Sequence, residues 1–588
     1  MLALEVRHCL VGACGCMRHA PNKCIFDPQE VQPPDDVKLL FKRYSENDTM
    51  TTDHLLKFLI EYQGEKHAAM EDAQAIFNSL KHLKIFQRRG LHLDAFFRYL
   101  LGDLNLAHSP ALGVHHDMDA PLAHYFIFTG HNSYLTGNQL SSDSSVDPII
   151  RALRGGVRVI ELDLWPNSKK DNVDVCHGGT LTKPVDFLKC MRAIKENAFL
   201  ASGYPLVLTF EDHLTPNLQA KVAQMVNRTF KGMLFRPGSK YWREFPSPAF
   251  LKNKIIISTK PPKEFSERLP GSNNSAEVFV NNEPLEKGMS DSNQLESDDG
   301  EDDWDDEEAA IFYPDAYKRL IAIHAGKPKG GKEQWLTSDF DKVKRVSLSE
   351  QALEDVVKTN GTDIVRFTQR NLLRVYPRGT RFDSSNYNPF IGWMHGAQMV
   401  AFNMQGYGKY LYIMHGMFRA NGGCGYVKKP DFLLSSGSDN TVFDPGAPLP
   451  VKTILRVKVY LGEGWHFDFS RTHFDQFSPP DFFVRVGIAG APADTMMRRT
   501  RAVQDKWAPA WDQEFEFRLT IPELAVVRVE VKDYNFTARN AFGGQACLPV
   551  TELRRGIRAV QLHDHRGVRY RSVKLLMGFH FLHTSTAD

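Results

Sequence analysis

The sequence lacks any long apolar run. None of its segments approaches the roughly 18 consecutive apolar residues of a membrane-spanning helix, so we expect no transmembrane segment. The first residues, MLALEVRHCLVGACGC, are interrupted by Glu5, Arg7 and His8, which disfavours a secretory signal peptide. A hydrophobic content of 42% and a charged content of 24% are instead typical of a soluble globular protein.

Cysteine is also scarce. Eight cysteines in 588 residues are too few for a disulfide scaffold, which favours a reduced, intracellular protein. Half of them, Cys9, Cys14, Cys16 and Cys24, lie near the start. Reversible acylation or a metal cluster would explain them, but they form no paired CxxC zinc motif and no Met-Gly start for myristoylation is present. We therefore favour an irregular tail at 1–30 with incidental thiols.

The charges are nearly balanced, at a formal net charge of +2, but they are unevenly distributed. The segment Glu296–Glu308, ESDDGEDDWDDEE, holds ten acids and no Lys or Arg, which leaves a net charge of +12 on the rest of the chain. A basic body predicts an anionic partner, either nucleic acid or anionic lipid. No helix-turn-helix, zinc or RNA-recognition signature is present, so we expect no nucleic-acid partner.

The length predicts about three to five domains, because 588 residues exceed what one core can hold. From Asp35 to Leu106 apolar residues recur at helical spacing, as in DDVKLLFKRYS. The loop SENDTMTTDHLL resembles an EF-hand loop in its position between two helices. It lacks the central Gly and the final Glu of such loops, so helical packing without bound calcium is the better interpretation.

The middle and the end of the chain follow two other patterns. Strand-like segments such as HYFIFTG and KIIIST alternate with helical ones, are interrupted by a Ser-, Asn- and acid-rich stretch, and then resume, which predicts one split (β/α)8 TIM-like barrel. From Val451 short alternating strands predict an all-β sandwich. The predicted division is a tail at 1–30, an EF-hand-like helical region at 31–110, barrel halves at 117–265 and 339–440, an acidic disordered linker at 266–338, and the sandwich at 450–588.

The segment VRVIELDLW carries an unusual pair of acids. Glu161 and Asp163 stand two residues apart in an apolar strand, so their side chains share one face. Two buried carboxylates repel each other, and a bound cation would resolve the conflict. The alternative is that they are structural groups neutralised by Arg158.

Polar residues also follow the other predicted strands of the barrel, where active groups gather at the carboxyl ends. Asn132, Glu161, Asp163 and Glu211 together offer an all-oxygen ligand set, which favours Ca²⁺, with Mg²⁺ second. Two histidines at the same predicted rim, His131 and His177, are then available for acid–base work or for stabilising an anion.

Several long motifs resemble those of phosphoinositide-specific phospholipase C. GHNSYLTGNQL, VRVIELDLWPN, HGGTLT and TFEDHLTP are similar to its X half. LRVYPRGTRFDSSNYNP and GAQMVAFNMQGYGKYLYIMHGMFRANGGCGYVKKP are similar to its Y half, and the sandwich to its C2 domain. The chain has a short helical N-terminal region and no pleckstrin-homology domain, which resembles the plant type.

The resemblance implies an enzyme that cleaves phosphatidylinositol 4,5-bisphosphate and related phosphoinositides into diacylglycerol and inositol phosphates in lipid signalling. Asn132, Glu161, Asp163 and Glu211 would hold one catalytic Ca²⁺. His131 would stabilise charge on the phosphoryl group, and Glu161 or Glu211 would take the proton of the inositol 2-hydroxyl. His177 would protonate the leaving diacylglycerol oxygen, and a cyclic phosphate would form before water opens it.

The resemblance also implies how the headgroup is bound. Ser347, which lies 27 residues before Arg374, would contact the 4-phosphate together with that arginine, and Tyr376 would pack on the inositol ring. Lys260 matches a phosphate-binding lysine of the family. Ser258 stands where animal members have a second lysine, which leaves the preferred phosphorylation state of the lipid open.

Membrane docking would fall to the C2 domain. Its loop KDYNFTARNAFGG keeps Asp533, but Asn535, Asn540 and Ala541 stand where relatives are commonly acidic, so we expect docking that depends little on Ca²⁺. Asp468, Asp475 and Asp481 offer partial compensation. The basic segment MMRRTRA, with Arg498, Arg499 and Arg501, would contact anionic lipid instead. We expect a cytoplasmic enzyme, peripheral at the plasma membrane.

Other interpretations remain open at this point. The acidic run is either a plain linker, a site for a basic partner, or a cover over the active site. The whole chain could be a phosphoinositide-binding scaffold that has lost catalysis, although both His131 and His177 are present. A glycerophosphodiester phosphodiesterase would also place His, Glu and Asp at a barrel rim, but it would not need Arg374, Tyr376 or a C2 domain.

Overall fold

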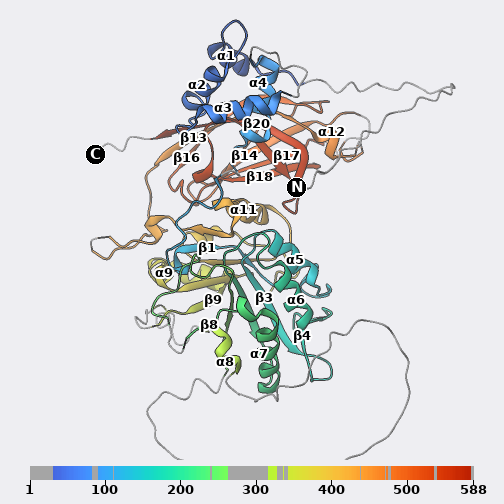
Figure 1. The fold of residues 1–588 in the computed structure, drawn as a ribbon, viewed down its shortest axis with the longest axis vertical. Helices are drawn as coiled ribbons and strands as arrows, with labels where there is room; N and C mark the ends of the chain where they lie inside the picture. Colours follow the sequence, from blue (N-terminus) through green and yellow to red (C-terminus); the bar gives the residue numbers. More distant parts are fainter. Residues whose placement is uncertain are drawn as a thin grey trace, which may run out of the picture.

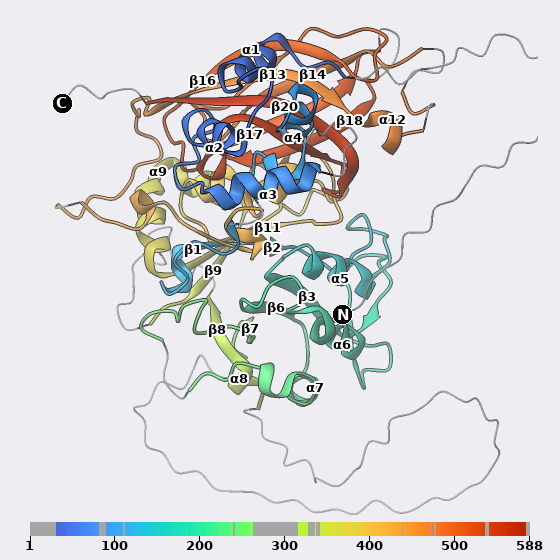
Figure 2. The same cartoon turned by 45° about the horizontal axis from the view of Figure 1, so that its top comes forward.

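A computed structural model describes most of the chain, namely residues 31–81, 90–109, 112–238, 242–262, 316–326, 336, 342–437, 439–470, 472–474, 478–535 and 540–583. The cysteines of the N-terminal tail and the acidic segment Glu296–Glu308 lie outside these residues, as does Asp475. Figures 1 and 2 show three stacked parts: the N-terminal helices, the β-sandwich beneath them, and the barrel at the far end.

The N-terminal part is helical, as its periodicity predicts. Its helices are α1 (Asp35–Arg43), α2 (Thr52–Glu61), α3 (Met70–Leu80) and α4 (Leu93–Leu100). Thr51 begins α2 by accepting the backbone N–H of His54, which satisfies a donor that the helix itself leaves unpaired. An antiparallel bridge between Met50 and Leu91 joins the segment before α2 to the one before α4.

Eight parallel strands form a closed barrel, because the first strand pairs with both the second and the last. Its strands are, in chain order, β2 (Thr129–Gly130), β3 (Val159–Pro166), β6 (Leu206–Asp212), β7 (Ile255–Thr259), β8 (Ile321–Gly326), β9 (Arg345–Ser349), β10 (Leu372–Tyr376) and β11 (Met399–Phe402). The prediction of one barrel whose halves come from two stretches of sequence is therefore confirmed. The predicted bounds of the linker, 266–338, need correction, because α8 (Ala316–Leu320) and the barrel strand β8 lie within them.

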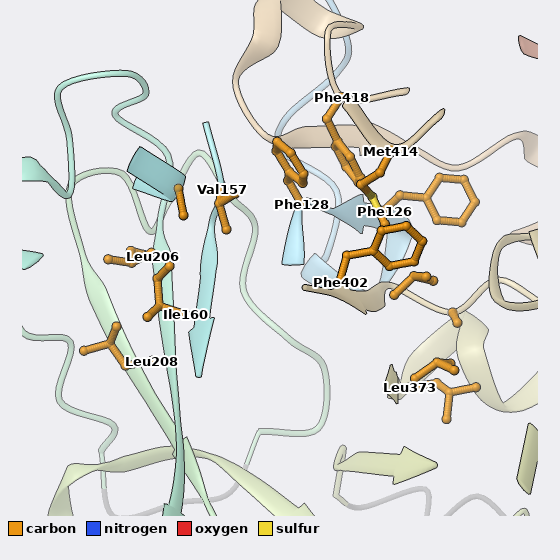
Figure 3. Packing of buried hydrophobic residues seen from close by; sticks show 14 of the residues in the cluster. Phe126, Phe128, Val157, Ile160, Leu206, Leu208, Leu373, Phe402, Met414 and Phe418 are labelled. Carbon is orange, nitrogen blue, oxygen red and sulfur yellow. The ribbon is translucent and has the colours of Figure 1, made fainter. Parts of the chain in front are cut away.

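The helices of the two halves are α5 (Val146–Arg154), α6 (Phe187–Asn197), α7 (Pro216–Phe230), α8 (Ala316–Leu320), α9 (Glu350–Arg370), α10 (Phe390–Trp393) and α11 (Lys409–Met417). Alternate strand residues face them. Ile160 of β3 and Leu208 of β6 lie in this outer core, which Figure 3 shows from close by. The intervening residues, such as Val159 and Val207, form a separate cluster inside the barrel.

One strand prediction needs correction. HYFIFTG does not form a single barrel strand but two short ones: β1 (Tyr125–Ile127) and the barrel strand β2. β1 pairs antiparallel with β12 (Tyr426–Lys428), so both of these short strands lie outside the barrel ladder. Tyr125 and Tyr426 are buried in the inner cluster, where this two-stranded sheet packs against the end of the barrel opposite the predicted active groups.

The C-terminal part is the predicted antiparallel sandwich, whose strands follow the order β15-β14-β17-β18-β19-β20-β13-β16. Their bounds are β13 (Thr453–Glu463), β14 (Phe482–Ala489), β15 (Met496–Arg499), β16 (Ala510–Leu519), β17 (Val526–Asp533), β18 (Phe542–Pro549), β19 (Gly556–His563) and β20 (Arg569–His583). A short helix, α12 (Trp465–Asp468), follows β13.

The three parts pack directly on one another. Tyr460, Leu461, Ile557 and Leu576 of the sandwich belong to the same apolar cluster as the N-terminal helices. On the other side, the hydroxyl of Tyr412 in α11 lies 2.6 Å from Nδ1 of His565. The sandwich therefore packs on the N-terminal helices through β13, β19 and β20, and on the barrel helix α11 through β17 and β18. None of the helices that the structure describes is long and apolar enough to span a membrane.

Candidate active site

The barrel interior changes from apolar to polar toward the carboxyl ends of its strands. The inner apolar cluster includes Val159 in β3 and Val207 in β6. Two residues further along each strand stand Glu161 and Thr209, which are register partners, and two further again Asp163 and Glu211. Because side chains alternate along a strand, all four of these polar residues point inward. The predicted carboxylates therefore converge at the mouth of the barrel.

Three carboxylates gather there: one oxygen each of Glu161, Asp163 and Glu211 lies within 4.8 Å of the others. Asp163 is buried, and within the described part of the chain its Oδ1 has no hydrogen-bond partner. Tyr134 donates to the other oxygen at 2.8 Å. Burial and the two neighbouring carboxylates raise the pKa of Asp163 well above its usual value. A buried carboxylate oxygen that has no hydrogen-bond partner among the described residues, beside two more carboxylates, fits a bound cation.

Asn132 completes the oxygen set. It is buried in the turn after β2 with a positive φ of 42°, a conformation that Asn tolerates better than most residues. Its backbone N–H donates to Glu161 at 3.3 Å, and its side-chain Nδ2 donates to Oε1 of Gln139 at 3.1 Å. The amide nitrogen is thus engaged, which leaves the oxygen as the atom able to bind a cation.

Arg374 forms a buried ion pair with Glu161. Burial alone would raise the pKa of Glu161, but Arg374 and then His131 more than offset this, and the pKa of Glu161 is lowered. The guanidinium also lies 5.4 Å from the ring centre of Tyr376. Arg158, the alternative partner of the acids, donates instead to the carbonyls of Val157, Ala198, Ser202 and others, so it does not neutralise them.

His131 is held in place by Asn403, a residue from the second half of the barrel. Its Nδ1 lies 2.9 Å from Oδ1 of Asn403, an oxygen that also accepts from Gln139 Nε2 at 3.1 Å. Nδ1 therefore carries the proton, and Nε2 points toward Glu161 Oε2 at 4.0 Å. Burial lowers the pKa of His131, and Glu161 opposes this shift. The ring can donate from Nε2 only as an imidazolium.

His177 is anchored in a similar way. Its Nδ1 lies 2.7 Å from the carbonyl oxygen of Gln139, which is an acceptor, so Nδ1 is again the protonated nitrogen. The hydroxyls of Thr180 and Thr182 donate to the carbonyl of His177 at 2.6 and 3.2 Å and hold the backbone of HGGTLT in place. Nε2 therefore faces a reacting group, from which it can accept a proton as a neutral imidazole or to which it can donate one as an imidazolium.

The sequence reasoning missed Gln139 and Asn403. Gln139 contacts Asn132, Asn403 and His177, so one side chain and its carbonyl position both histidines and a candidate metal ligand. Asn403 follows β11 directly, at the same strand-end position that identified the other site residues. That rule, applied to β11, would have found it. Gln139 lies within a quoted motif but after no strand, so only its contacts reveal it.

The predicted headgroup residues occupy one sector of the mouth. Ser347 of β9 and Arg374 of β10 are direct register partners, although 27 residues separate them in sequence. Lys260 is exposed immediately after β7. Ser258 is fully buried inside the barrel, where its hydroxyl donates to the Ile323 carbonyl at 3.1 Å. Ser258 therefore lies deeper in the barrel than Lys260, two residues earlier along the same face of the strand.

The acids of the C2 loops are largely engaged with the backbone. Asp468 accepts N–H groups of Ser572 and Val573 at 2.6 and 3.1 Å, and Asp533 accepts that of Asp481 at 2.7 Å. Within the described ranges, no group of three potential metal ligands occurs on these loops. Arg498, Arg499 and Arg501 are all exposed.

Comparison with family models covers most of the chain. Residues 118–261 match the model "Phosphatidylinositol-specific phospholipase C, X domain" and residues 329–432 match its Y domain. Residues 31–105 match "Phosphoinositide-specific phospholipase C, efhand-like", and residues 453–564 match the C2 domain.

Individual relatives agree with the family models. The chain is 58% identical over 571 residues to Phosphoinositide phospholipase C 2 of Arabidopsis thaliana, covering 94% of this chain and 96% of that protein. It is 33% identical over 547 residues to the Mus musculus protein named 1-phosphatidylinositol 4,5-bisphosphate phosphodiesterase delta-3, covering 90% of this chain and 66% of that one. The crystal structure of L. pealei PLC21 has a similar fold, with a TM-score of 0.73, 25% identity, and coverage of 94% and 69%.

Proposed function

Because the chain belongs to the phosphoinositide-specific phospholipase C family, and is an enzyme of the plant type, we propose that it hydrolyses phosphatidylinositol 4,5-bisphosphate and related phosphoinositides to diacylglycerol and inositol phosphates. The observation that carries this proposal is the barrel mouth. There a carboxylate cluster, two oriented histidines and a buried arginine meet from both halves of the barrel.

Asn132, Glu161, Asp163 and Glu211 would hold a Ca²⁺ ion, with the orphaned oxygen of Asp163 as the strongest argument for it. Hard oxygen ligands of mixed carboxylate and amide type are what Ca²⁺ prefers. When bound, the ion would supply positive charge that lowers the pKa of the inositol 2-hydroxyl.

The chain's own residues would then move the protons. Glu161 or Glu211 takes the proton of the inositol 2-hydroxyl, whose oxygen forms a bond to phosphorus. As the bond from phosphorus to the diacylglycerol oxygen breaks, His177 donates a proton to that oxygen, leaving a cyclic phosphate. In the second step His177 takes a proton from water, whose oxygen forms a bond to phosphorus. The bond from phosphorus to the inositol 2-oxygen breaks, and that oxygen takes back the proton held by Glu161 or Glu211. His131, fixed by Asn403, would donate to the phosphoryl oxygens from Nε2 as an imidazolium, the form that the negative charge of the bound phosphodiester favours against the effect of burial.

Arg374, Ser347, Lys260 and Tyr376 would select the headgroup. The forked guanidinium of Arg374 suits two phosphate oxygens, and Ser347 lies beside it in register. Arg374 is paired with Glu161, so a 4-phosphate would compete with that carboxylate for the same cation. The ring of Tyr376 would pack against the inositol ring. Exposed Lys260 would add charge at the rim.

The substrate lies in a membrane, so the enzyme would act as a cytoplasmic protein, peripheral at the plasma membrane. The C2 domain and its exposed arginines would contact the anionic phosphoinositide surface. With the C2 acids engaged by backbone amides, we expect this contact to depend little on Ca²⁺.

The proposal is tested by following products from vesicles that contain either phosphatidylinositol or its 4,5-bisphosphate. We expect diacylglycerol with both cyclic and open inositol phosphates. His177→Ala should prevent both formation of the cyclic phosphate and hydrolysis of cyclic inositol phosphate supplied in solution, whereas His67→Ala at an exposed site should change neither. A folded wild-type enzyme that binds the vesicles but releases no product would favour the scaffold alternative.

A further inference from the structure

The outer wall of the barrel carries a groove between two neighbouring helices. α6 and α7 pack side by side (Figures 1 and 2), and a groove of about 890 Å³ lies between their outer faces and the short turn η4 (Lys231–Met233). The inward faces of both helices are buried against the strands, with Ile194 and Val226 in the outer core. The strands therefore separate this groove from the carboxylates inside the barrel mouth, and no residue that lines it has a role in the proposed reaction.

The groove is strongly basic. Five of the eleven residues that line it are basic and one is acidic. The basic residues are Arg192 and Lys195 on α6, Lys221 and Arg228 on α7, and Lys231 on η4. Lys195, Arg228 and Lys231 are exposed, and none of these three forms an ion pair with another described residue. Cations that share one hollow repel one another, so the groove favours an anionic occupant.

The floor of the groove is apolar. Leu188 of α6, Met225 of α7 and Met233 of η4 line it, and each is partly buried. Met225 and Met233 also pack against the outer core. Methionine side chains adapt their shape to a neighbour and form favourable contacts between sulfur and aromatic rings. An apolar floor together with several positive charges suits an acidic peptide that carries an aromatic residue.

The chain contains a segment of this composition. Glu296–Glu308, ESDDGEDDWDDEE, holds ten acids and no Lys or Arg, and its one aromatic residue, Trp304, has acids on both sides. This segment lies outside the described residues. Its charge is opposite to that of the groove, and its tryptophan matches the methionines of the floor.

The position of the segment in the chain brings it within reach of the groove. Eight residues lead from Glu308 to the start of α8 at Ala316, and α8 packs against α7. Eight residues span at most about 26–29 Å when extended, whereas the fifteen residues of α7 span only about 22 Å. The segment can therefore reach the groove, and a short tether gives it an effective concentration there of about the millimolar range.

We propose that Glu296–Glu308 binds in the groove between α6 and α7, with its carboxylates against the basic side chains and Trp304 on the methionines. The segment would then be held on the outer wall of the barrel and not over its mouth. An anionic membrane is the alternative occupant, but a concave groove fits an extended peptide better than a flat surface. A bound segment would also neutralise cations that would otherwise attract anionic lipid.

The first test uses the whole chain and a carbodiimide, which joins a carboxylate to a neighbouring lysine amine as an amide bond without a spacer. We expect acids of 296–308 to be joined to Lys195, Lys221 or Lys231, as mapped by mass spectrometry of the digested protein. Lys260, exposed after β7 at the barrel mouth, is the comparison. Absence of amides to the groove lysines, or amides to Lys260 in their place, would overturn the proposal.

The second test measures affinity. Replacing all ten acids of the segment by their amides leaves the groove open in the whole chain, and a labelled peptide of sequence 296–308 is titrated into this variant. We expect binding that is blocked in the wild-type chain by its own segment. Adding Lys195→Glu and Arg228→Glu should weaken peptide binding about 10-fold or more, because each reversal replaces an attraction with a repulsion. Salt at about 1 M, where the Debye length is about 3 Å, should also weaken it.

A matched pair of reversals controls for net charge. Lys42→Glu with Lys66→Glu, at exposed positions of the N-terminal part, should leave peptide affinity unchanged. Peptide binding that is equally strong in the wild-type chain, or that the groove reversals do not weaken, would overturn the proposal. Groove reversals that weaken binding to anionic vesicles, but not to the peptide, would show that the groove binds membrane instead. None of these measurements depends on catalytic turnover, so their outcome is independent of the proposed reaction.

Discussion

At the scale of single residues, Asp163 carries the strongest electrostatic conflict at the barrel mouth. It is buried beside two other carboxylates, and one of its oxygens has no hydrogen-bond partner among the described residues. Asp163→Asn keeps an acceptor for the Tyr134 hydroxyl but removes the charge. We expect the variant to melt at a higher temperature than wild type in EDTA, to lose stabilisation by Ca²⁺, and to lose activity. Asp143→Asn, at an exposed carboxylate, should do none of these.

The same conflict predicts a pH dependence for the metal-free protein. The pKa of Asp163 is raised in the folded state, so folding favours its protonated form, and the stability linked to this residue is lost as pH rises through the raised pKa. Each unit of elevation corresponds to about 1.4 kcal/mol. In denaturant titrations with EDTA, the advantage of Asp163→Asn over wild type should be smaller at pH 5 than at pH 8. An advantage that does not vary with pH would contradict this account.

Arg374 faces two partners, Glu161 in the free enzyme and a phosphate in the proposed complex. Arg374→Ala should reduce kcat/KM for the 4,5-bisphosphate by about 10–150-fold more than for phosphatidylinositol, as expected for the loss of a charged hydrogen bond of about 1.5–3 kcal/mol. Arg374→Lys should restore little, because an ammonium cannot form the forked contact. Equal losses on both lipids would show that Arg374 acts only by holding Glu161.

The residues that sequence could identify are those whose position follows from strand periodicity. Glu161 and Asp163 were found because two acids on one face of a strand conflict with burial, and the strand-end rule gave His131, Asn132 and Glu211. The pairing of Arg374 with Glu161 could not be predicted from the residues alone, because it joins positions 213 residues apart across the closed barrel. The contact of Gln139 with Asn403 could not be predicted for the same reason, because these residues are also far apart in the sequence.

At the scale of elements, strand pairing in the closed barrel explains why most strands are predictable from the sequence and why HYFIFTG is not. Long apolar strands such as β3 and β6 were recognised from composition, but HYFIFTG gives no local signal that its first half leaves the barrel to pair with β12. The division between β1 and β2 depends on a partner roughly 300 residues away in sequence. The pairing of β1 with β12 in the folded chain, and not the local sequence pattern, therefore determines where β1 ends and β2 begins.

The contact between the N-terminal helices and the sandwich depends on Arg558. Its side chain is fully buried and donates to Glu65 at 2.7 Å, Asn105 at 2.9 Å and the Gln63 carbonyl at 2.9 Å. Arg558→Ala should lower the free energy of unfolding by about 2–5 kcal/mol, because it removes a fully buried side chain and one donor from each of three acceptors. Denaturant titration measures this directly.

A matched control separates this effect from ordinary loss of a surface ion pair. Arg569 pairs with Asp103 at 2.9 Å, but both side chains are about half exposed or more. Arg569→Ala should therefore change the free energy of unfolding by no more than about 1 kcal/mol. A comparable loss in the two variants would contradict a structural role for the buried contact.

At the scale of the whole molecule, the stacking of the three parts makes the sandwich dependent on its neighbours. Tyr460, Leu461, Ile557 and Leu576 are buried against the N-terminal helices, so a fragment of residues 451–588 would expose this apolar face. Vesicle binding by the C2 domain should for that reason be measured in the full-length chain. This packing was not apparent from the sequence, where the two regions are separated by the entire barrel.

Membrane docking should then depend on charge. Replacing Arg498, Arg499 and Arg501 by Gln should weaken binding of the full-length chain to anionic vesicles by about 1 kcal/mol per residue, equally in EDTA and in Ca²⁺. Neutral vesicles are the matched control, because charge should contribute little there. Tight binding that requires Ca²⁺ and is unchanged in the triple variant would contradict docking through these arginines.

The central claim is that the barrel mouth is a Ca²⁺-dependent phosphodiesterase site in which His131 acts on the phosphoryl group. It is tested most directly by measuring release of water-soluble inositol phosphates from vesicles containing phosphatidylinositol 4,5-bisphosphate while free Ca²⁺ is titrated. We predict Ca²⁺-dependent turnover that falls about 10²–10⁴-fold in His131→Ala, with vesicle binding and melting temperature retained. Wild-type turnover that needs no Ca²⁺, or turnover that survives in His131→Ala, would contradict the account.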